Sequence, residues 1–224
     1  MGYQLDWSIL WKYRLLLWSG LGMTCQLVGV ASLAALGIGI LVGVMRQSRT
    51  ITLRLLTRVY VEVNRNIPLV VKLFVCYFVL AIPAIPAAII GLVIHQSAYI
   101  AEDVRAAIQA IPRGQPESAL STGLSRWMVA YYVTLPQALR MVLPALTNEF
   151  VELLKNSSVA MVISVEELTF TTEQINYITF RGFEVATGVT FLYFTLSWLV
   201  SEVTRRCVKP KPGEQMISAY GKSQ

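Results

Sequence analysis

Polar side chains interrupt the fourth long apolar run of the sequence at helical spacing. Asn148, Glu152 and Lys155 lie four and then three residues apart, on one face of a helix, and Asn156 and Ser157 come directly after them. A charge at the centre of a membrane helix costs about 2.5 to 3.5 kcal/mol, so such side chains usually face the bundle interior or a water-filled path. Two interpretations are open. Glu152 and Lys155 neutralise each other and hold neighbouring helices, or the set lines a pathway for a polar solute.

Two further ionisable groups lie in apolar surroundings. His95 is the only histidine and precedes Gln96, Ser97 and Tyr99, whereas Lys72 stands alone in an apolar run. The histidine is expected to be neutral and bonded to a neighbouring helix, to contact a solute, or to relay a proton. Lys72 and His95 therefore join the candidate pathway residues.

The chain lacks the residue sets that enzymes use. It shows no Ser-His-Asp set, HExxH sequence or paired carboxylates on one membrane face, and its three scattered cysteines suit neither a metal site nor a disulfide framework. The Gly-Lys-Ser at 221–223 matches the end of a phosphate-binding loop, but Met216 stands where the first glycine belongs. We therefore expect a non-catalytic protein that binds no metal and no nucleotide cofactor.

The elements that must position these groups are membrane helices. Apolar residues make up 55% of the 224 residues and charged residues only 14%, below the roughly 25% of soluble domains. About 20 apolar residues cross a hydrocarbon core as helix, and Pro83 and Pro86 divide the longest run into a tight hairpin. The expected fold is an all-α membrane bundle. Its five predicted transmembrane helices lie at about residues 21–45, 59–82, 87–108, 137–165 and 185–203.

The positions of Lys and Arg predict the orientation. The net charge of +6 comes mostly from basic residues after the first and third spans and in the tail. By the positive-inside rule these segments are cytoplasmic, so the N-terminus lies outside and residues 207–224 form a cytoplasmic tail. Residues 1–20 contain three Trp, with Lys12 and Arg14, and are expected to form an external interfacial helix. Topology explains the basic charge without a nucleic-acid partner.

A polar stretch at about residues 110–136 separates the third and fourth spans. Its apolar residues recur at helical spacing, which predicts an amphipathic helix of about three or four turns. These residues are Leu120, Leu124, Trp127, Met128 and Tyr131. Gly123 costs about 1 kcal/mol against alanine in an exposed helix, which indicates a turn between two short helices or a close backbone contact with a partner. A helix that rests on its own bundle is the alternative.

The same stretch contains Glu117-Ser118-Ala119, then Gly123, Val133 and Leu135-Pro136. It resembles the EAA loop of ABC importer permeases, which has Glu-Ala-Ala, then Gly and Ile, and a final Leu-Pro at the same spacing. "RNIPLVVKLFVCYF" and "VELLKNSSV" on either side resemble the polar amino-acid uptake branch of that family. The resemblance covers about residues 20–206, and residues 21–206 would form the permease domain.

The resemblance implies a type I ABC importer-like permease with a cytoplasmic coupling helix, in the bacterial cytoplasmic (inner) membrane. Its implied partners are ATPase subunits that bind ATP and Mg themselves, a second identical or homologous permease subunit, and an external solute-binding protein. Mutation of Gly123 should uncouple ATP hydrolysis from transport. The implied ATPase-coupling residues are Glu117, Ala119, Gly123, Leu124, Arg126, Trp127, Leu135 and Pro136.

The resemblance also suggests the cargo. The sequence is most similar to permeases for the acidic amino acids glutamate and aspartate, and Lys72 and Lys155 would complement an anionic side chain. Lys72 departs from the uncharged residue expected in many relatives, and glutamine or a basic amino acid stays open. The alternative function is an ion-coupled secondary amino-acid transporter in which Glu152, Lys155 and His95 handle the ion. The lack of a visible inverted repeat argues against that alternative.

Overall fold

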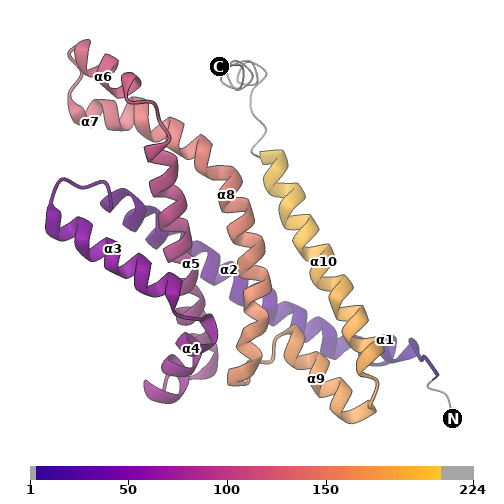
Figure 1. Cartoon of the computed structure of the whole chain (residues 1–224). Helices are drawn as coiled ribbons and strands as arrows, with labels where there is room; N and C mark the ends of the chain where they lie inside the picture. The colour runs from indigo at the N-terminus through magenta and orange to yellow at the C-terminus, as the bar shows by residue number, and fades with distance from the viewer. Residues whose placement is uncertain (1–3, 208–224) are drawn as a thin grey trace.

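The computed structural model describes residues 4–207, and this part of the chain consists of helices and turns without a strand (Figure 1). The all-α expectation is confirmed. Three of the segments are not α-helical: η1 and η2 are single π-helical turns, and η3 is a 3-10 helix. The elements are α1 (Ser8–Lys12), α2 (Arg14–Met45), α3 (Ile51–Asn66), α4 (Leu69–Phe74), η1 (Val75–Val79), α5 (Ala84–Gln109), α6 (Gly114–Ser121), α7 (Arg126–Val129), η2 (Ala130–Thr134), α8 (Leu135–Asn156), η3 (Ser157–Ile163), α9 (Leu168–Thr179) and α10 (Gly182–Cys207).

The core is built around α2, which packs along α5. Buried positions of α2 recur every three or four residues and are mostly small, among them Ala35, Gly39 and Gly43. A β-carbon on Gly39 would lie 2.6 Å from Cβ of Ile100, and one on Gly43 would lie 2.7 Å from Cβ of Val104. Glycine is therefore needed for this approach. Small residues let membrane helices gain van der Waals contact that lipid cannot supply.

Within residues 4–207, three helices are long and apolar enough to cross a membrane: α2, α5 and Gly182–Thr204 of α10. They correspond to the first, third and fifth predicted spans. The first begins at Arg14 and not near residue 21, because no proline interrupts the mostly apolar sequence between them. Part of the stretch expected to lie on the membrane surface therefore continues the first long helix.

The second predicted span, residues 59–82, is not one continuous helix. α3 ends at Asn66, Ile67 is extended with φ −94° and ψ 125°, and α4 begins after Pro68. Proline has no N–H to donate and disfavours helical geometry at the residue before it, so it ends α3. The chain then continues as a short apolar helix, Leu69–Val79. The prediction of a single unbroken span was wrong in this respect.

The hairpin predicted at the two prolines is confirmed. η1 ends at Val79, Ala81 takes a left-handed φ of 52°, and α5 begins directly after Pro83. Pro86 lies in the first turn of α5, where its missing N–H has no helical acceptor to lose. The chain therefore reverses between two apolar helices.

The fourth predicted span divides into α8 and η3. The 22 residues of α8 would extend roughly 33 Å, but the helix carries several charged groups and is not one of the three long apolar helices. η3 continues to Ile163, and Ser164 then takes a left-handed φ of 62°. A five-span count therefore goes beyond what helix length and hydropathy establish.

A buried polar network ties α9 to α2 and α10. The fully buried Glu167 carboxylate accepts hydrogen bonds from the N–H of Phe170 at 2.8 Å and from the hydroxyl of Tyr193 at 2.8 Å. On the α2 side, Thr24 Oγ1 accepts the N–H of Leu168 at 3.1 Å. A carboxylate at a helix N-terminus satisfies N–H groups that have no helical acceptor. The network thus fixes the start of α9 against both long helices.

The two ends of the bundle differ (Figure 1). α6 and α7 extend from one end of α8, and α9 lies at its other end, close to α1 and the start of α10. At that second end the backbone N–H of Asp6 donates to Glu184 at 2.9 Å, and the rings of Trp7 and Phe183 meet edge to face at 6.5 Å. These contacts therefore hold the N-terminal segment against the start of α10.

Candidate functional site

The first candidate site is the elbow, defined as residues 114–134 and formed by α6, α7 and η2. Gly123 lies in the turn between α6 and α7 with a φ of +86°, which residues with a side chain rarely adopt. No atom lies within 4 Å of where its β-carbon would stand. Of the two roles predicted for Gly123, the structure shows the turn. The elbow contains two short helices and not one helix of three or four turns.

The second half of the elbow is continuous with a long helix of the bundle. Ser125 begins α7 by accepting the backbone N–H of Met128 at 3.3 Å. α7, η2 and α8 then succeed one another without an intervening residue, and Pro136 lies in the first turn of α8. α7 and η2 therefore form one continuous segment with α8, which packs against α5 and α10.

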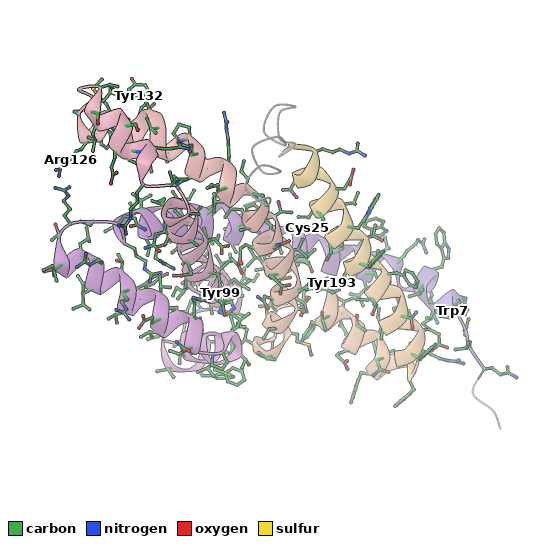
Figure 2. The ribbon with its side chains drawn as sticks, turned by 45° about the horizontal axis from the view of Figure 1, so that its top comes forward. Trp7, Cys25, Tyr99, Arg126, Tyr132 and Tyr193 are labelled. Atoms are coloured by element: carbon green, nitrogen blue, oxygen red, sulfur yellow. The ribbon has the colours of Figure 1, made fainter. Side chains whose placement is uncertain are left out.

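The elbow exposes large apolar side chains. Trp127 is 76% exposed, Tyr132 is 65% exposed, and the Trp127 ring stacks on Tyr131 at 6.4 Å between centroids. Figure 2 shows Tyr132 and Arg126 at this end of the molecule. Neighbouring exposed apolar side chains of this kind are typical of a protein interface. Of the predicted coupling residues, Ala119 and Leu124 are partly buried, and Glu117, Gly123, Arg126, Trp127, Leu135 and Pro136 are exposed.

The second candidate site is a polar cluster where α3, α4 and α5 meet. Lys72 is only 8% exposed, its ammonium donates to the carbonyl of Asn64, and its Nζ lies 2.9 Å from Nδ1 of His95. The His95 ring packs on Tyr99 at 5.1 Å, and the Arg65 guanidinium lies 5.2 Å from the centre of the same Tyr99 ring. We call this group the Lys72 cluster. It brings together Lys72 and His95, two of the predicted pathway residues.

The neighbouring face of α5 binds α8. The side-chain amide of Gln96 donates to the carboxylate of Glu149 and, at 3.0 Å, to its backbone carbonyl. Further along α5, a buried carboxylate oxygen of Asp103 has no hydrogen-bond partner among residues 4–207. Gln96, Glu149 and Asp103 were not among the predicted site residues. The signal for them was their polarity inside apolar helices.

The predicted pathway residues of α8 are more exposed than expected for a buried site. Lys155 Nζ lies 2.8 Å from Glu152 Oε1, and both side chains are about half exposed, 55% and 54%. Asn148 is exposed, Asn156 is partly buried, and the buried Ser157 hydroxyl donates to the Leu154 carbonyl at 2.7 Å. The Glu152–Lys155 pairing matches the structural interpretation of these two residues.

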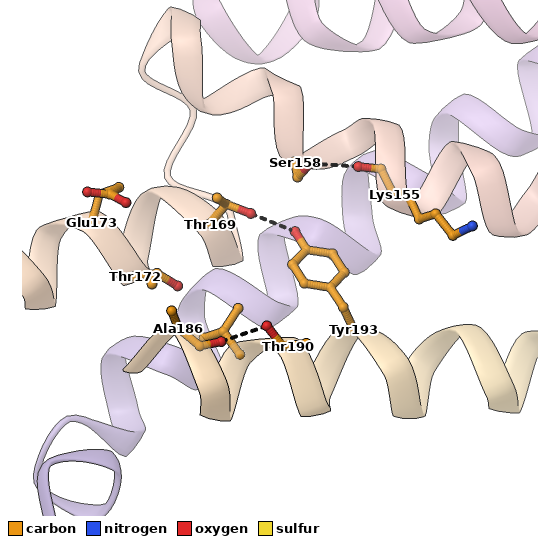
Figure 3. Close-up of a pocket in the computed structure, with 9 residues that line it drawn as sticks. Lys155, Ser158, Thr169, Thr172, Glu173, Ala186, Thr190 and Tyr193 are labelled. Atoms are coloured by element: carbon orange, nitrogen blue, oxygen red, sulfur yellow. Dashed lines mark hydrogen bonds between the residues drawn. The ribbon is translucent and has the colours of Figure 1, made fainter. Parts of the chain in front are cut away.

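Lys155 also borders a cavity of about 340 Å³ between α8, α9 and α10 (Figure 3). Lys155 and Ser158 line one side and Glu173 lies opposite, and Thr169 and Tyr193 are hydrogen-bonded at 3.1 Å in its wall. Across the described chain, no hydrogen bond or ion pair joins this region to the Lys72 cluster. The predicted pathway residues therefore fall into two separate groups.

Solved structures share this arrangement. A crystal structure of an amino acid ABC transporter with histidines has a TM-score of 0.87 and 36% identity, covering 92% of this chain and 99% of that chain. An inward-facing structure of the MetNI methionine ABC transporter has a TM-score of 0.74 at 24% identity, covering 88% of this chain and 96% of that chain, which shows a common fold.

Curated relatives match over nearly the whole sequence. The glutamine transport system permease protein GlnP of Escherichia coli (strain K12) is 35% identical over 210 residues, covering 91% of this chain and 96% of that protein. The probable glutamine ABC transporter permease protein GlnP of Bacillus subtilis (strain 168) is 32% identical over 200 residues, covering 85% and 91%. These similarities favour an ABC permease over the ion-coupled transporter.

The family described as "Binding-protein-dependent transport system inner membrane component" matches residues 35–208, which include the broken second span, the elbow and the polar groups of α8. The relatives and the solved structure with the same fold belong to amino-acid ABC transporters. The chain belongs to this family, as a permease for amino-acid uptake by an ABC transporter.

Proposed function

We propose that the chain is the non-catalytic permease subunit of an ATP-driven importer for polar amino acids. It crosses the bacterial inner membrane five times, with the broken α3–α4 segment and α8 as the second and fourth crossings. The N-terminus lies outside, and the elbow and tail lie in the cytoplasm. The observation that carries this proposal is the elbow, which exposes apolar side chains and runs without interruption into α8.

The elbow is the docking site for an ATPase subunit. Trp127 and its stacked neighbour Tyr131 supply the apolar anchors, and Glu117 and Arg126 lie at the polar rim. ATP and Mg bind to that partner and not to this chain. Since α7, η2 and α8 are continuous, rigid-body motion of the ATPase is transmitted along α8 into the bundle. A second permease subunit and an external solute-binding protein complete the importer.

The Lys72 cluster is the main candidate for substrate binding. The buried ammonium of Lys72 has no carboxylate within ion-pair distance in the described chain. A buried cation without a counter-ion is costly, and an anionic group of a bound solute would relieve that cost. The second cation, Arg65, lies against the Tyr99 ring, and Glu149 of α8 accepts hydrogen bonds from Gln96 on the adjoining face of α5.

Two cations and a carboxylate match an acidic amino acid, which carries two carboxylates and one ammonium. Glutamate or aspartate is therefore the proposed cargo, with Lys72 and Arg65 on the carboxylates and Glu149 on the ammonium. Glutamine is the second candidate, because the two GlnP relatives are named as glutamine permeases. His95 serves as a neutral partner of Lys72. Asn148, Glu152, Lys155, Asn156 and Ser157 line a later part of the same path.

Reconstituted transport tests this function. Proteoliposomes that contain the permease, its ATPase and its external binding protein are expected to accumulate labelled glutamate when ATP is supplied, and to be unaffected by collapse of a proton gradient. Liposomes with the permease alone are the control. Accumulation by the permease alone, driven by an ion gradient, would refute the ATP-driven mechanism. Accumulation of glutamine in preference to glutamate would support the ATP-driven mechanism but show that glutamine is the cargo.

A further inference from the structure

Two adjoining cavities lie between the elbow and the turn that joins α2 to α3. One, of about 250 Å³, is lined by Arg49 of that turn and by Arg126 of the elbow. The other, of about 540 Å³, is lined by Arg113. Thr134 borders both, so we treat them together as the arginine cavity. Arg49 comes from the α2–α3 turn, whereas Arg113 and Arg126 come from the segment between α5 and η2.

These arginines have no anionic partner within residues 4–207. Arg49, Arg113 and Arg126 form no ion pair or side-chain hydrogen bond with the described chain, and all three are exposed. Their neighbours behave differently, since Arg46 and Arg105 both bind Glu102. A guanidinium binds phosphate or carboxylate through two parallel hydrogen bonds. The cavity is therefore arranged to receive an anion from outside the chain.

The position of the cavity points to the source of that anion. It opens just beyond the ends of two helices that are long and apolar enough to cross a membrane, α2 at Met45 and α5 at Gln109. Residues just past a span lie in the headgroup layer of the bilayer. The lining is also partly apolar, through Ile108, Ile111 and Val129. Basic pockets at this depth on the cytoplasmic side are suited to anionic lipid headgroups.

We propose that the arginine cavity binds a phosphate group, namely the headgroup of an anionic phospholipid of the cytoplasmic leaflet. This site rests on the proposed function, which places the elbow in the cytoplasm. A bound headgroup bridges the α2–α3 turn and the elbow, and so holds the elbow in place relative to the first long helix. Coupling between ATPase and permease then depends on anionic lipid as well as on the protein interface.

Lipid retention tests the proposal. The complete transporter is purified from membranes that contain phosphatidylglycerol, and the lipid that stays bound is counted by mass spectrometry. Loss of two arginines in Arg49→Gln/Arg126→Gln is expected to lower bound phosphatidylglycerol roughly tenfold. The matched control is Arg54→Gln/Arg58→Gln, which removes two exposed charges of α3 that do not line the cavity. Equal retention in the two double variants overturns the proposal.

A second measurement separates a lipid from a free ion. Short-chain phosphatidylglycerol and inorganic phosphate are each added to the detergent-solubilised complex at equal concentration, and the melting temperature is recorded. A shift with the lipid alone, absent in Arg49→Gln, supports the headgroup. Equal shifts with both ligands would assign the cavity to free phosphate and overturn the lipid source. No shift with either overturns the site.

Copurification of the ATPase tests whether the arginines contact a protein carboxylate and not a lipid. Arg126 lies in the elbow, whereas Arg49 lies outside it, so the two single variants separate lipid binding from docking. If Arg49→Gln leaves lipid retention unchanged but releases the ATPase, the arginines contact a protein carboxylate and the lipid proposal is wrong. A wild-type chain that transports without any ATPase would instead refute the proposed function while leaving lipid retention intact.

Discussion

The elbow and the Lys72 cluster interrupt the same apolar chain, but the structure arranges their side chains in opposite ways. The elbow turns large apolar groups outward, with Trp127 76% and Tyr132 65% exposed. The Lys72 cluster turns a charge inward, with Lys72 only 8% exposed where α3, α4 and α5 meet. Each region is incomplete in the described chain. The elbow lacks a cover for its apolar surface, and the cluster lacks a counter-ion.

The contrast extends to how each region is held. The shape of the elbow depends on backbone conformation at Gly123, where no neighbouring atom restricts a side chain. The Lys72 cluster depends on side-chain contacts between helices, at distances such as 2.9 Å from Lys72 to His95. Backbone changes should therefore damage coupling, whereas changes of charge should damage substrate binding.

The largest effect is expected from Gly123→Val. A β-branched residue at φ +86° is strained by about 1 to 3 kcal/mol, so the α6–α7 turn must open or shift. We expect uptake to fall at least roughly tenfold in proteoliposomes, while the ATPase subunits continue to hydrolyse ATP. ATP hydrolysis and uptake would be measured on the same preparation.

Gly114→Ala is the matched control for that variant. Gly114 begins α6 and also has open space around it, but it does not take a positive φ. Its replacement should leave uptake within about twofold, because alanine favours a helix. Equal losses in the two variants would show that the elbow tolerates no change of any kind, and the positive φ of Gly123 would no longer explain the loss of coupling.

Lys72→Gln gives the next largest effect and tests the cargo. Removing the buried cation should weaken the preference for glutamate over glutamine by roughly tenfold, because only glutamate carries the second carboxylate. Competition between the two unlabelled amino acids for uptake measures that preference. If Lys72→Gln leaves the preference for glutamate over glutamine unchanged, the proposal of an acidic cargo recognised by Lys72 is wrong.

A smaller effect is expected for the exposed pair of α8. Lys155 and Glu152 are each about half exposed, and an exposed ion pair contributes only about 0 to 1 kcal/mol. Lys155→Met and Glu152→Gln should therefore leave stability almost unchanged. We expect uptake to fall by less than about threefold. If uptake falls in these variants by as large a factor as glutamate preference falls in Lys72→Gln, the main substrate site lies on α8 and not beside α5.

The sequence predicted the elbow better than it predicted the polar cluster, and the reason is physical. Gly123 and the Leu135-Pro136 step act through local backbone geometry, which a sequence reports directly. Contacts between helices depend on packing angles that no local pattern encodes. The Gln96–Glu149 contact, across 53 residues, could not be derived from spacing. The break in the second span could have been found, since Pro68 comes directly after Ile67 in the sequence.

Exposure was the hardest property to predict on α8. Its spacing correctly placed Glu152 and Lys155 on one face, yet spacing alone does not say which face of a helix meets the bundle. The face that carries Leu146 and Leu153 is buried, whereas Glu152 and Lys155 point elsewhere. For the same reason, spacing did not identify Glu149, which lies one turn from Glu152 and accepts a hydrogen bond from Gln96 of α5.

Tyr193→Phe should have the smallest effect on transport. It tests whether the polar network around Glu167 stabilises the fold only, in contrast to the elbow and the Lys72 cluster. The Tyr193 hydroxyl donates to the fully buried Glu167 carboxylate at 2.8 Å and is also hydrogen-bonded with the Thr169 hydroxyl at 3.1 Å. Removal of the hydroxyl loses both bonds, and the bond to the carboxylate contributes about 1 to 3 kcal/mol. The carboxylate still accepts the N–H groups of Thr169 and Phe170, so the start of α9 keeps its cap.

The expected result is a melting temperature lower by a few degrees, with the uptake rate per folded transporter unchanged. Thermal unfolding in detergent and uptake normalised to folded protein are the two measurements. Tyr193 also borders the cavity between α8, α9 and α10, and a substrate held there would lose a contact. A clear fall in uptake affinity without loss of stability would therefore show that this cavity, and not the Lys72 cluster alone, holds the cargo.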